Sequence, residues 1–374
     1  MEKHTNQNSE QIKYPTSHFD NDYLSGPIKN YIFIVLDCYS YVSGENATGE
    51  VCLNIIKNVP LASLKIVVKS VETVIVYDKV IKVAPLVEER SEVFNIEEIL
   101  QTWDALQPGH YIFPFSFKVP FYAPATLNFS GEDSSGHYLK AEIFYHISAK
   151  LLSNHKETSQ VHSRIITIKN RDSLSKPTSS MEISSIVPSC CFTSRGTTKL
   201  HLHIKNSEHS SINSEVKFNL EPDNSLCQVP VNHVTALVFS DITLSTRKGN
   251  FHSAKIISKI ERAAWINSHS NRVYEKDFDY AVELKGFSEE LNPSSNLTPL
   301  ISCRYFVEMR VFYDVVFNRR PVVVRIPFHV NPHVFYGKEE VLLPLDWDPL
   351  EAPICYFAPE MKNMLYVEER DSVV

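Results

Sequence analysis

Long apolar runs are missing from this sequence of 374 residues. No stretch reaches the roughly 18 uninterrupted apolar residues that a membrane-spanning helix needs, so we expect no such helix. Residues 1–10 are polar and contain no apolar segment, so we expect no secretory signal either. Both absences favour a cytoplasmic protein.

Recognisable catalytic and nucleotide-binding motifs are also lacking. The sequence contains no Gly-x-Ser-x-Gly, no P-loop and no Gly-x-Gly-x-x-Gly. None of its seven cysteines has Cys-x-x-Cys spacing, so we interpret them as reduced thiols of a cytosolic protein. We therefore expect no enzyme activity and no cofactor.

Glycine is scarce, with 10 residues, whereas proline numbers 21 and phenylalanine and tyrosine together number 38. Aromatic and β-branched residues favour strands, and proline supplies much of the loop punctuation. Short strand patterns fill residues 31–168 and 189–330. Residues 95–100, Asn-Ile-Glu-Glu-Ile-Leu, predict one short helix, because Asn95 is a good N-cap and the acids fall in the first turn.

The most informative strand pattern lies at residues 106–120, Leu-Gln-Pro-Gly-His-Tyr-Ile-Phe-Pro-Phe-Ser-Phe-Lys-Val-Pro. Its rings recur at every second position, so they lie on one face of a sheet and are buried together. Pro114 interrupts this strand and cannot donate to a ladder. The strand is therefore predicted to lie at a sheet edge, or to direct the missing N–H outward.

Two all-β halves follow from these patterns, and we predict a fold of two tandem β-sandwiches. A weak internal repeat supports this: the segment that begins at Tyr145 resembles the one that begins at Tyr305. The predicted boundaries are a disordered arm (1–30), a first sandwich (31–170), a linker (171–185), a second sandwich (186–331) and an acidic tail (332–374).

The chain resembles the arrestin fold family, and among its members it is most similar to the alpha-arrestins, the arrestin-domain-containing proteins. The likeness spans about residues 31–331 and rests on motifs in a fixed order: Gly44-Glu45 with Gly49-Glu-Val, Phe113-Pro-Phe115, Tyr145-His-Ile-Ser-Ala, Cys190-Cys191 and Tyr305-Phe-Val-Glu-Met-Arg-Val.

This resemblance implies two arrestin-like β-sandwiches and a non-catalytic scaffold or adaptor. It would bind cytoplasmic tails of membrane proteins and link them to endocytic or endosomal machinery. Alpha-arrestins often recruit ubiquitin ligases through Pro-Pro-x-Tyr, but here the nearest match is Ala352-Pro353-Ile-Cys-Tyr356, so ligase recruitment is not carried over. A retromer-type arrestin-like coat subunit and a carbohydrate- or lipid-binding β-sandwich remain alternatives.

The tail carries most of the net charge. Residues 332–374 hold nine acids and three bases, or −6 of the chain's −7. The nearly neutral remainder does not favour nucleic-acid binding. Within the tail, Leu342, Leu343, Leu345 and Asp346 fit a clathrin box, which would recruit clathrin or another coat protein. A last strand packed on a sandwich is the structural alternative.

Two weaker signals remain. The terminus matches a PDZ ligand, with Ser372 at position −2 and Val374 last. His201 and His203 lie on one face of a predicted strand, and His329 and His333 add two imidazoles. Since no acidic or thiol partner stands at ligand spacing nearby, packing or surface exposure is favoured over a metal role, and we expect no metal site.

Overall fold

The structure of the protein is a computed structural model. It describes residues 30–79, 84–154, 159–170, 179–186, 194–205, 214–270, 279–284, 291–295, 298–314, 320–331 and 348–357. Every regular element in these ranges is a strand, so the prediction of an all-β protein is confirmed. No helix capable of crossing a bilayer occurs in this part of the chain.

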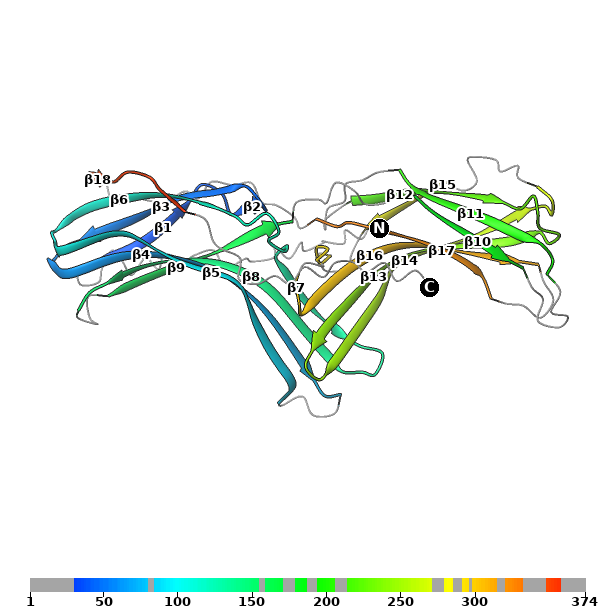
Figure 1. Ribbon diagram of the computed structural model, residues 1–374, viewed down its shortest axis with the longest axis horizontal. Coiled ribbons are helices and arrows are strands. Elements are labelled where there is room, and N and C mark those ends of the chain that lie inside the picture. The colour runs from blue at the N-terminus through cyan, green and yellow to red at the C-terminus, as the bar shows by residue number, and fades with distance from the viewer. Residues whose placement is uncertain are drawn as a thin grey trace, which may run out of the picture.

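The first half consists of two facing sheets (Figure 1). One sheet has the order β1-β3-β6-β18, with β19 also on β6, and the other has the order β2-β9-β8-β4-β5, with β7 also on β8. The strands are β1 (Tyr31–Leu36), β2 (Ser40–Val42), β3 (Asn46–Ile55), β4 (Val59–Tyr77), β5 (Pro85–Leu106), β6 (Gly109–Lys118), β7 (Leu127–Glu132), β8 (Tyr138–Leu152), β9 (Gln160–Lys169), β18 (Pro349–Glu351) and β19 (Cys355–Phe357).

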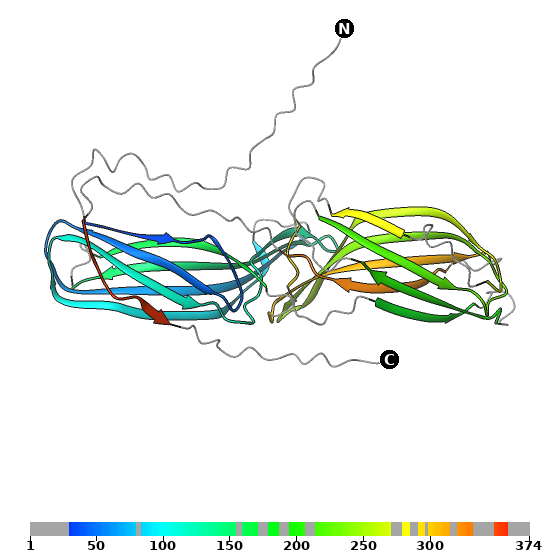
Figure 2. The ribbon, with the colours of Figure 1, turned by 90° about the horizontal axis from the view of Figure 1, so that it is seen from above.

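The second half likewise consists of two sheets, but each of these has four strands. Their orders are β10-β11-β12-β15 and β14-β13-β16-β17. Its strands are β10 (Ser179–Ser185), β11 (Thr197–Ile204), β12 (Ser214–Asp223), β13 (Val231–Thr246), β14 (Gly249–Ile266), β15 (Asp279–Leu284), β16 (Ile301–Tyr313) and β17 (Val322–Phe328). Seen from above, the two halves lie end to end (Figure 2).

The aromatic strand β6, predicted at residues 106–120, packs largely as the alternation of its rings predicts. Phe113, Phe115 and Phe117 of β6 are buried, whereas Tyr111 is half-buried. Gly49 on β3 lies directly opposite Phe115. A Cβ at Gly49 would lie 2.5 Å from the Val35 carbonyl oxygen and 2.8 Å from Phe115 Cζ. The Gly49-Glu-Val motif therefore needs glycine because the neighbouring strand and ring leave no room for a side chain.

The faint repeat has a structural counterpart. Tyr145 on β8 and Tyr305 on β16 are both buried, and each hydroxyl donates a hydrogen bond to a loop carbonyl, that of Pro124 and that of Asn292 respectively. Buried tyrosine hydroxyls need such partners, and the two equivalent tyrosines find them in the same way in both halves.

The predicted helix at residues 95–100 is wrong, because these residues lie inside β5. The long strand β4 pairs with them in register, from Lys69 opposite Asn95 to Lys65 opposite Ile99. Glu97 lies 3.8 Å from Lys65 in an ion pair across the strands. Pairing of β5 with β4, a strand of 19 residues, thus overrides the local helix signal.

Two further segments differ from the sequence prediction. Residues 179–185 of the expected linker form β10, which pairs antiparallel with β11. Residues 349–357 of the expected tail form β18 and β19 on the first half. Main-chain hydrogen bonds supply this pairing, so it needs no apolar pattern in the segment itself. The domain boundaries stay a prediction.

The two halves contact each other where long strands cross near the centre of the molecule (Figure 1). The Arg247 backbone N–H donates to Glu89 Oε1 at 2.7 Å, and Lys248 Nζ donates to the Leu86 carbonyl at 2.7 Å. Ser253 Oγ donates to the Glu132 carbonyl at 2.8 Å. These polar contacts join β5 and β7 of the first half to the β13–β14 hairpin of the second.

A buried carboxylate lies at the same junction. Glu72 on β4 has no solvent exposure, and burial raises its pKa to about 7. The Thr298 hydroxyl and the backbone of residues 300 and 301, which belong to the second half, oppose this rise. Among the described residues neither carboxylate oxygen of Glu72 has a hydrogen bond of normal geometry. The junction therefore holds a group whose charge state bears on stability.

Candidate functional site

The free edge of β6 is covered by a segment from the end of the chain. On one side β6 pairs antiparallel with β3. On the other side it pairs in parallel with β18, from His110 opposite Pro349, and with β19, from Phe115 opposite Cys355. A segment more than 200 residues downstream thus completes the sheet, as the red strand at the end of the first half shows (Figure 1).

Pro114 determines where this added strand is interrupted. The Ala352 N–H donates to the Ile112 carbonyl at 2.9 Å, so Ile112 presents its main-chain groups to the added segment. Residues two apart in a strand face the same side, so Pro114 also faces the added segment and not β3. The break between β18 and β19 falls opposite Pro114. The prediction that its missing N–H points away from the ladder therefore holds for the β3 ladder.

Side chains anchor the added segment at its second strand. The rings of Phe357 and Phe117 are stacked, with centroids 5.7 Å apart and planes inclined by 18°. Ala352 and Phe357 pack against the core, whereas Leu350, Ile354 and Tyr356 are exposed. A shallow hollow of about 380 Å³ lies beside this anchor, lined by Asn46, Ser116, Lys118, Tyr356 and Phe357. Main-chain pairing with alternate side-chain anchors is the general mode of strand addition.

The same segment contains the sequence's nearest match to a ligase-recruiting motif, residues 352–356. Residues 352–354 lie between β18 and β19, and Cys355 and Tyr356 belong to β19, where Tyr356 is 73% exposed. The proposed clathrin-box residues Leu342, Leu343, Leu345 and Asp346 lie outside the described residues, as do Ser372 and Val374. These linear motifs stay predictions.

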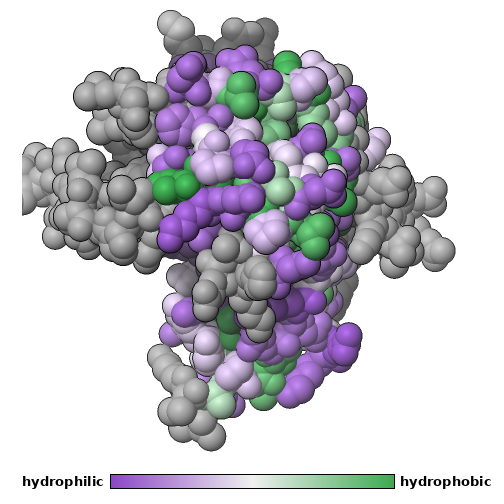
Figure 3. All heavy atoms as spheres, turned by 90° about the vertical axis from the view of Figure 1, so that its left-hand side faces the viewer, coloured by the Kyte–Doolittle hydropathy of each residue, from purple (hydrophilic) through white to green (hydrophobic). Residues whose placement is uncertain are grey.

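The surface at the end of the first half is chemically mixed. On the face shown in Figure 3, apolar residues are interspersed with polar ones and do not form one broad apolar area. This face therefore offers no broad apolar patch, and the feature of the first half that stands out is the strand edge of β6.

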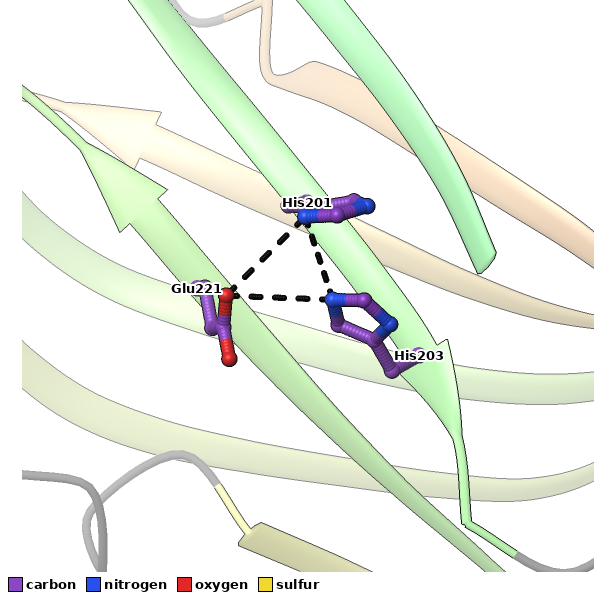
Figure 4. Close-up of side chains that lie close together, drawn as sticks. All are labelled: His201, His203 and Glu221. Atoms are coloured by element: carbon purple, nitrogen blue, oxygen red, sulfur yellow. Dashed lines mark hydrogen bonds and ion pairs between the residues drawn. The ribbon is translucent and has the colours of Figure 1, made fainter. Parts of the chain in front are cut away.

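A second site candidate lies on the outer face of the β10-β11-β12-β15 sheet. His203 Nε2 lies 3.1 Å from His201 Nδ1, and Glu221 Oε2 lies 3.9 Å from His201 Nδ1 and 3.7 Å from His203 Nε2. Figure 4 shows the two rings of β11 and the carboxylate of β12 turned toward one point. These three side chains could hold a metal ion.

Sequence reasoning placed the two histidines on one face but found no acidic partner. Glu221 stands 20 residues beyond His201 and comes opposite it only through the antiparallel pairing of β11 with β12. The added strand on β6 was also missed. Its residues Ile354, Tyr356 and Phe357 are of types that favour strands, but a segment this short does not identify its partner.

No protein-family model matches the sequence. Over 310 residues the chain is 23% identical to "Arrestin domain-containing protein A" of Dictyostelium discoideum, a match that covers 75% of this chain and 48% of that protein. The chain therefore spans about half the length of this curated relative. The similarity supports a distant relation to arrestin-domain proteins, whereas the closer likeness to alpha-arrestins stays a prediction.

Proposed function

We propose that this protein is a non-catalytic adaptor of the arrestin type that acts in membrane-protein trafficking. The β6 edge would receive an extended cytoplasmic segment of a membrane protein as an added parallel strand. The observation that carries this proposal is the pairing of residues 349–357 with β6, since an edge that binds one extended segment has the geometry to bind another.

In this account residues 349–357 occupy the edge until a partner segment displaces them. The preceding acidic stretch, with Leu342, Leu343, Leu345 and Asp346, would recruit clathrin or another coat protein. Having both functions on one chain raises their effective concentration without any chemistry. We place the protein in the cytoplasm, at the surface of the plasma membrane or endosomes.

Substitutions at Ser116 test whether a partner segment binds at the β6 edge. Like Ile112 and Pro114, Ser116 faces the added strand, so Ser116→Pro removes a donor on that side and leaves the β3 ladder its donors. Pro114 shows that β6 accommodates proline at such a position. Ser116→Ala is the matched control, because it removes the hydroxyl and keeps the N–H.

The experiment measures capture of a panel of synthetic cytoplasmic segments of membrane proteins by the full chain. Phe357→Ala should raise the affinity by about tenfold, because loss of one stacked ring weakens the competing segment by roughly 1.4 kcal/mol. Ser116→Pro should abolish capture, and Ser116→Ala should leave it unchanged. Equal capture by the wild type, Ser116→Pro and Phe357→Ala would refute strand addition at β6.

A further inference from the structure

The cluster of His201, His203 and Glu221 has the composition and the arrangement of a transition-metal site. In β11 the two histidines stand two residues apart, so both project from the same face. In β12 Glu221 is directly opposite His201. The backbone pairing of two adjacent strands therefore sets the positions of all three side chains.

The spacing of the three ligand atoms is close to what zinc requires. Tetrahedral Zn²⁺ with bonds of about 2.0–2.2 Å to nitrogen and oxygen places its ligand atoms about 3.3–3.6 Å apart. The observed spacings are 3.1, 3.7 and 3.9 Å. Small side-chain rotations are enough to bring all three atoms into one coordination shell. Two imidazoles with one carboxylate are also a donor set that Zn²⁺ accepts and that Mg²⁺ and Ca²⁺ do not favour.

The surroundings favour a cation at this point. The three side chains border an open hollow of about 850 Å³, whose ionic lining consists of three acids and two lysines: Glu221, Asp223, Asp279, Lys199 and Lys205. Lys205 Nζ lies 2.7 Å from Asp279 Oδ1, and Lys199 stands opposite Asp223 in the strand register. Acids therefore stand beside both lysines, and Glu221 is the remaining carboxylate of the lining.

A hydrogen bond between the two rings accounts for only part of the arrangement. At 3.1 Å one imidazole N–H can donate to the other ring's nitrogen, and this leaves the Glu221 oxygen beyond normal hydrogen-bond distance of either ring nitrogen. A divalent cation between the three atoms would replace that proton and satisfy the two nitrogens and the carboxylate together.

We propose that His201, His203 and Glu221 bind one Zn²⁺ ion on the outer face of the second half. The three protein ligands come from one side, so the fourth position faces the hollow and is open to water or to a ligand group of a partner. Bound Zn²⁺ links β11 to β12 by side chains as well as by the backbone ladder. This site is separate from the β6 edge, so the zinc proposal does not depend on the adaptor proposal.

The test uses the full chain, purified without a polyhistidine tag and stripped with a chelator. Equilibrium dialysis with elemental analysis measures zinc binding, and Co²⁺ titration followed by visible absorption reports tetrahedral coordination. We expect one ion of either metal per chain. His203→Gln and Glu221→Gln should each weaken the affinity for Zn²⁺ by about tenfold or more. Excess Mg²⁺ should not compete, and acidification should release the metal as the imidazoles take up protons.

His252→Gln is the matched control. It removes another histidine of the second half, from β14, whose ring contacts Thr243 and no member of the cluster. This variant should bind zinc as the wild type does. Equal affinities of the wild type and His203→Gln would overturn the proposal, as would a wild type that binds no zinc. Circular dichroism of each variant shows whether a lost site reflects lost folding, which these surface side chains should not cause.

Discussion

The buried carboxyl of Glu72 should make this protein less stable as the pH rises, which is the opposite of the usual effect of an acidic side chain. Its pKa in the folded chain is about 7, against an ordinary value of 4.5. Between these values the unfolded chain releases the proton while the folded chain keeps it, so stability falls as pH rises from 4.5 to 7. Below pH 4.5 the carboxyl is protonated in both states, so its ionisation contributes nothing to the pH dependence of stability. Above 7 the full cost applies, about 3 kcal/mol at 1.36 kcal/mol per pH unit.

Glu72→Gln removes the titrating group and keeps the size of the side chain. Urea denaturation of the wild type and the variant between pH 5 and 8 gives the free energy of unfolding of each. The free energy of unfolding of the variant, relative to that of the wild type, should rise by about 2–3 kcal/mol from pH 5 to pH 8. Other titrating groups, such as His162, affect both proteins alike and cancel in the difference.

Glu142→Gln is the matched control, because it removes an exposed carboxyl from the neighbouring strand β8. Its effect on stability should show no comparable slope. A difference between wild type and Glu72→Gln that stays constant from pH 5 to 8 would refute the reasoning, because it would mean that Glu72 does not change its charge in this range.

Three further outcomes follow from packing and charge. Gly49→Ala should lower the free energy of unfolding by about 1–3 kcal/mol in urea denaturation, because the new Cβ meets the Val35 carbonyl and Phe115; an unchanged midpoint would contradict this. Glu308→Gln should cost about 1–2 kcal/mol at pH 7, because Glu308 is buried and its oxygens lie 2.6 Å from half-exposed Arg310 and Arg325. Desolvation raises the pKa of Glu308, but these two guanidiniums outweigh it and hold the pKa below the ordinary value. This stabilisation is therefore present above pH 4.5 and lost as pH falls further; a cost that persists in acid would argue against it. Tyr305→Phe should cost about 1 kcal/mol, because the buried hydroxyl's hydrogen bond to the Asn292 carbonyl is lost; calorimetry showing an equal melting temperature would exclude it.

Local pattern was enough to place most strands. The strand patterns predicted over residues 31–168 and 189–330 contain β1 to β8 and β11 to β17, and the alternating rings of β6 are buried as expected apart from the half-buried Tyr111. The failures have one physical cause. Residues 95–100, 179–185, 349–351 and 355–357 are strands because another strand pairs with each of them, and the pairing rests on main-chain groups more than on side-chain pattern.

The same limit applies to the sites. The two histidines share a face by strand period, which sequence shows, but Glu221 joins them only through the register of β11 with β12. Likewise Pro114 indicated where a ladder must lack a donor, yet nothing local showed that the end of the chain would cover that edge. Register and long-range pairing are properties of the folded chain as a whole.

Hydrogen exchange of the β6 amides tests most directly whether this edge accepts an added strand. The measurement compares the full chain, the chain lacking residues 348–374, and that truncated chain with a synthetic peptide of residues 348–358. We predict that protection of the amides facing the added strand, such as that of Ser116, falls on truncation and returns with the peptide, but not with a scrambled one. Protection that truncation leaves unchanged would contradict the account.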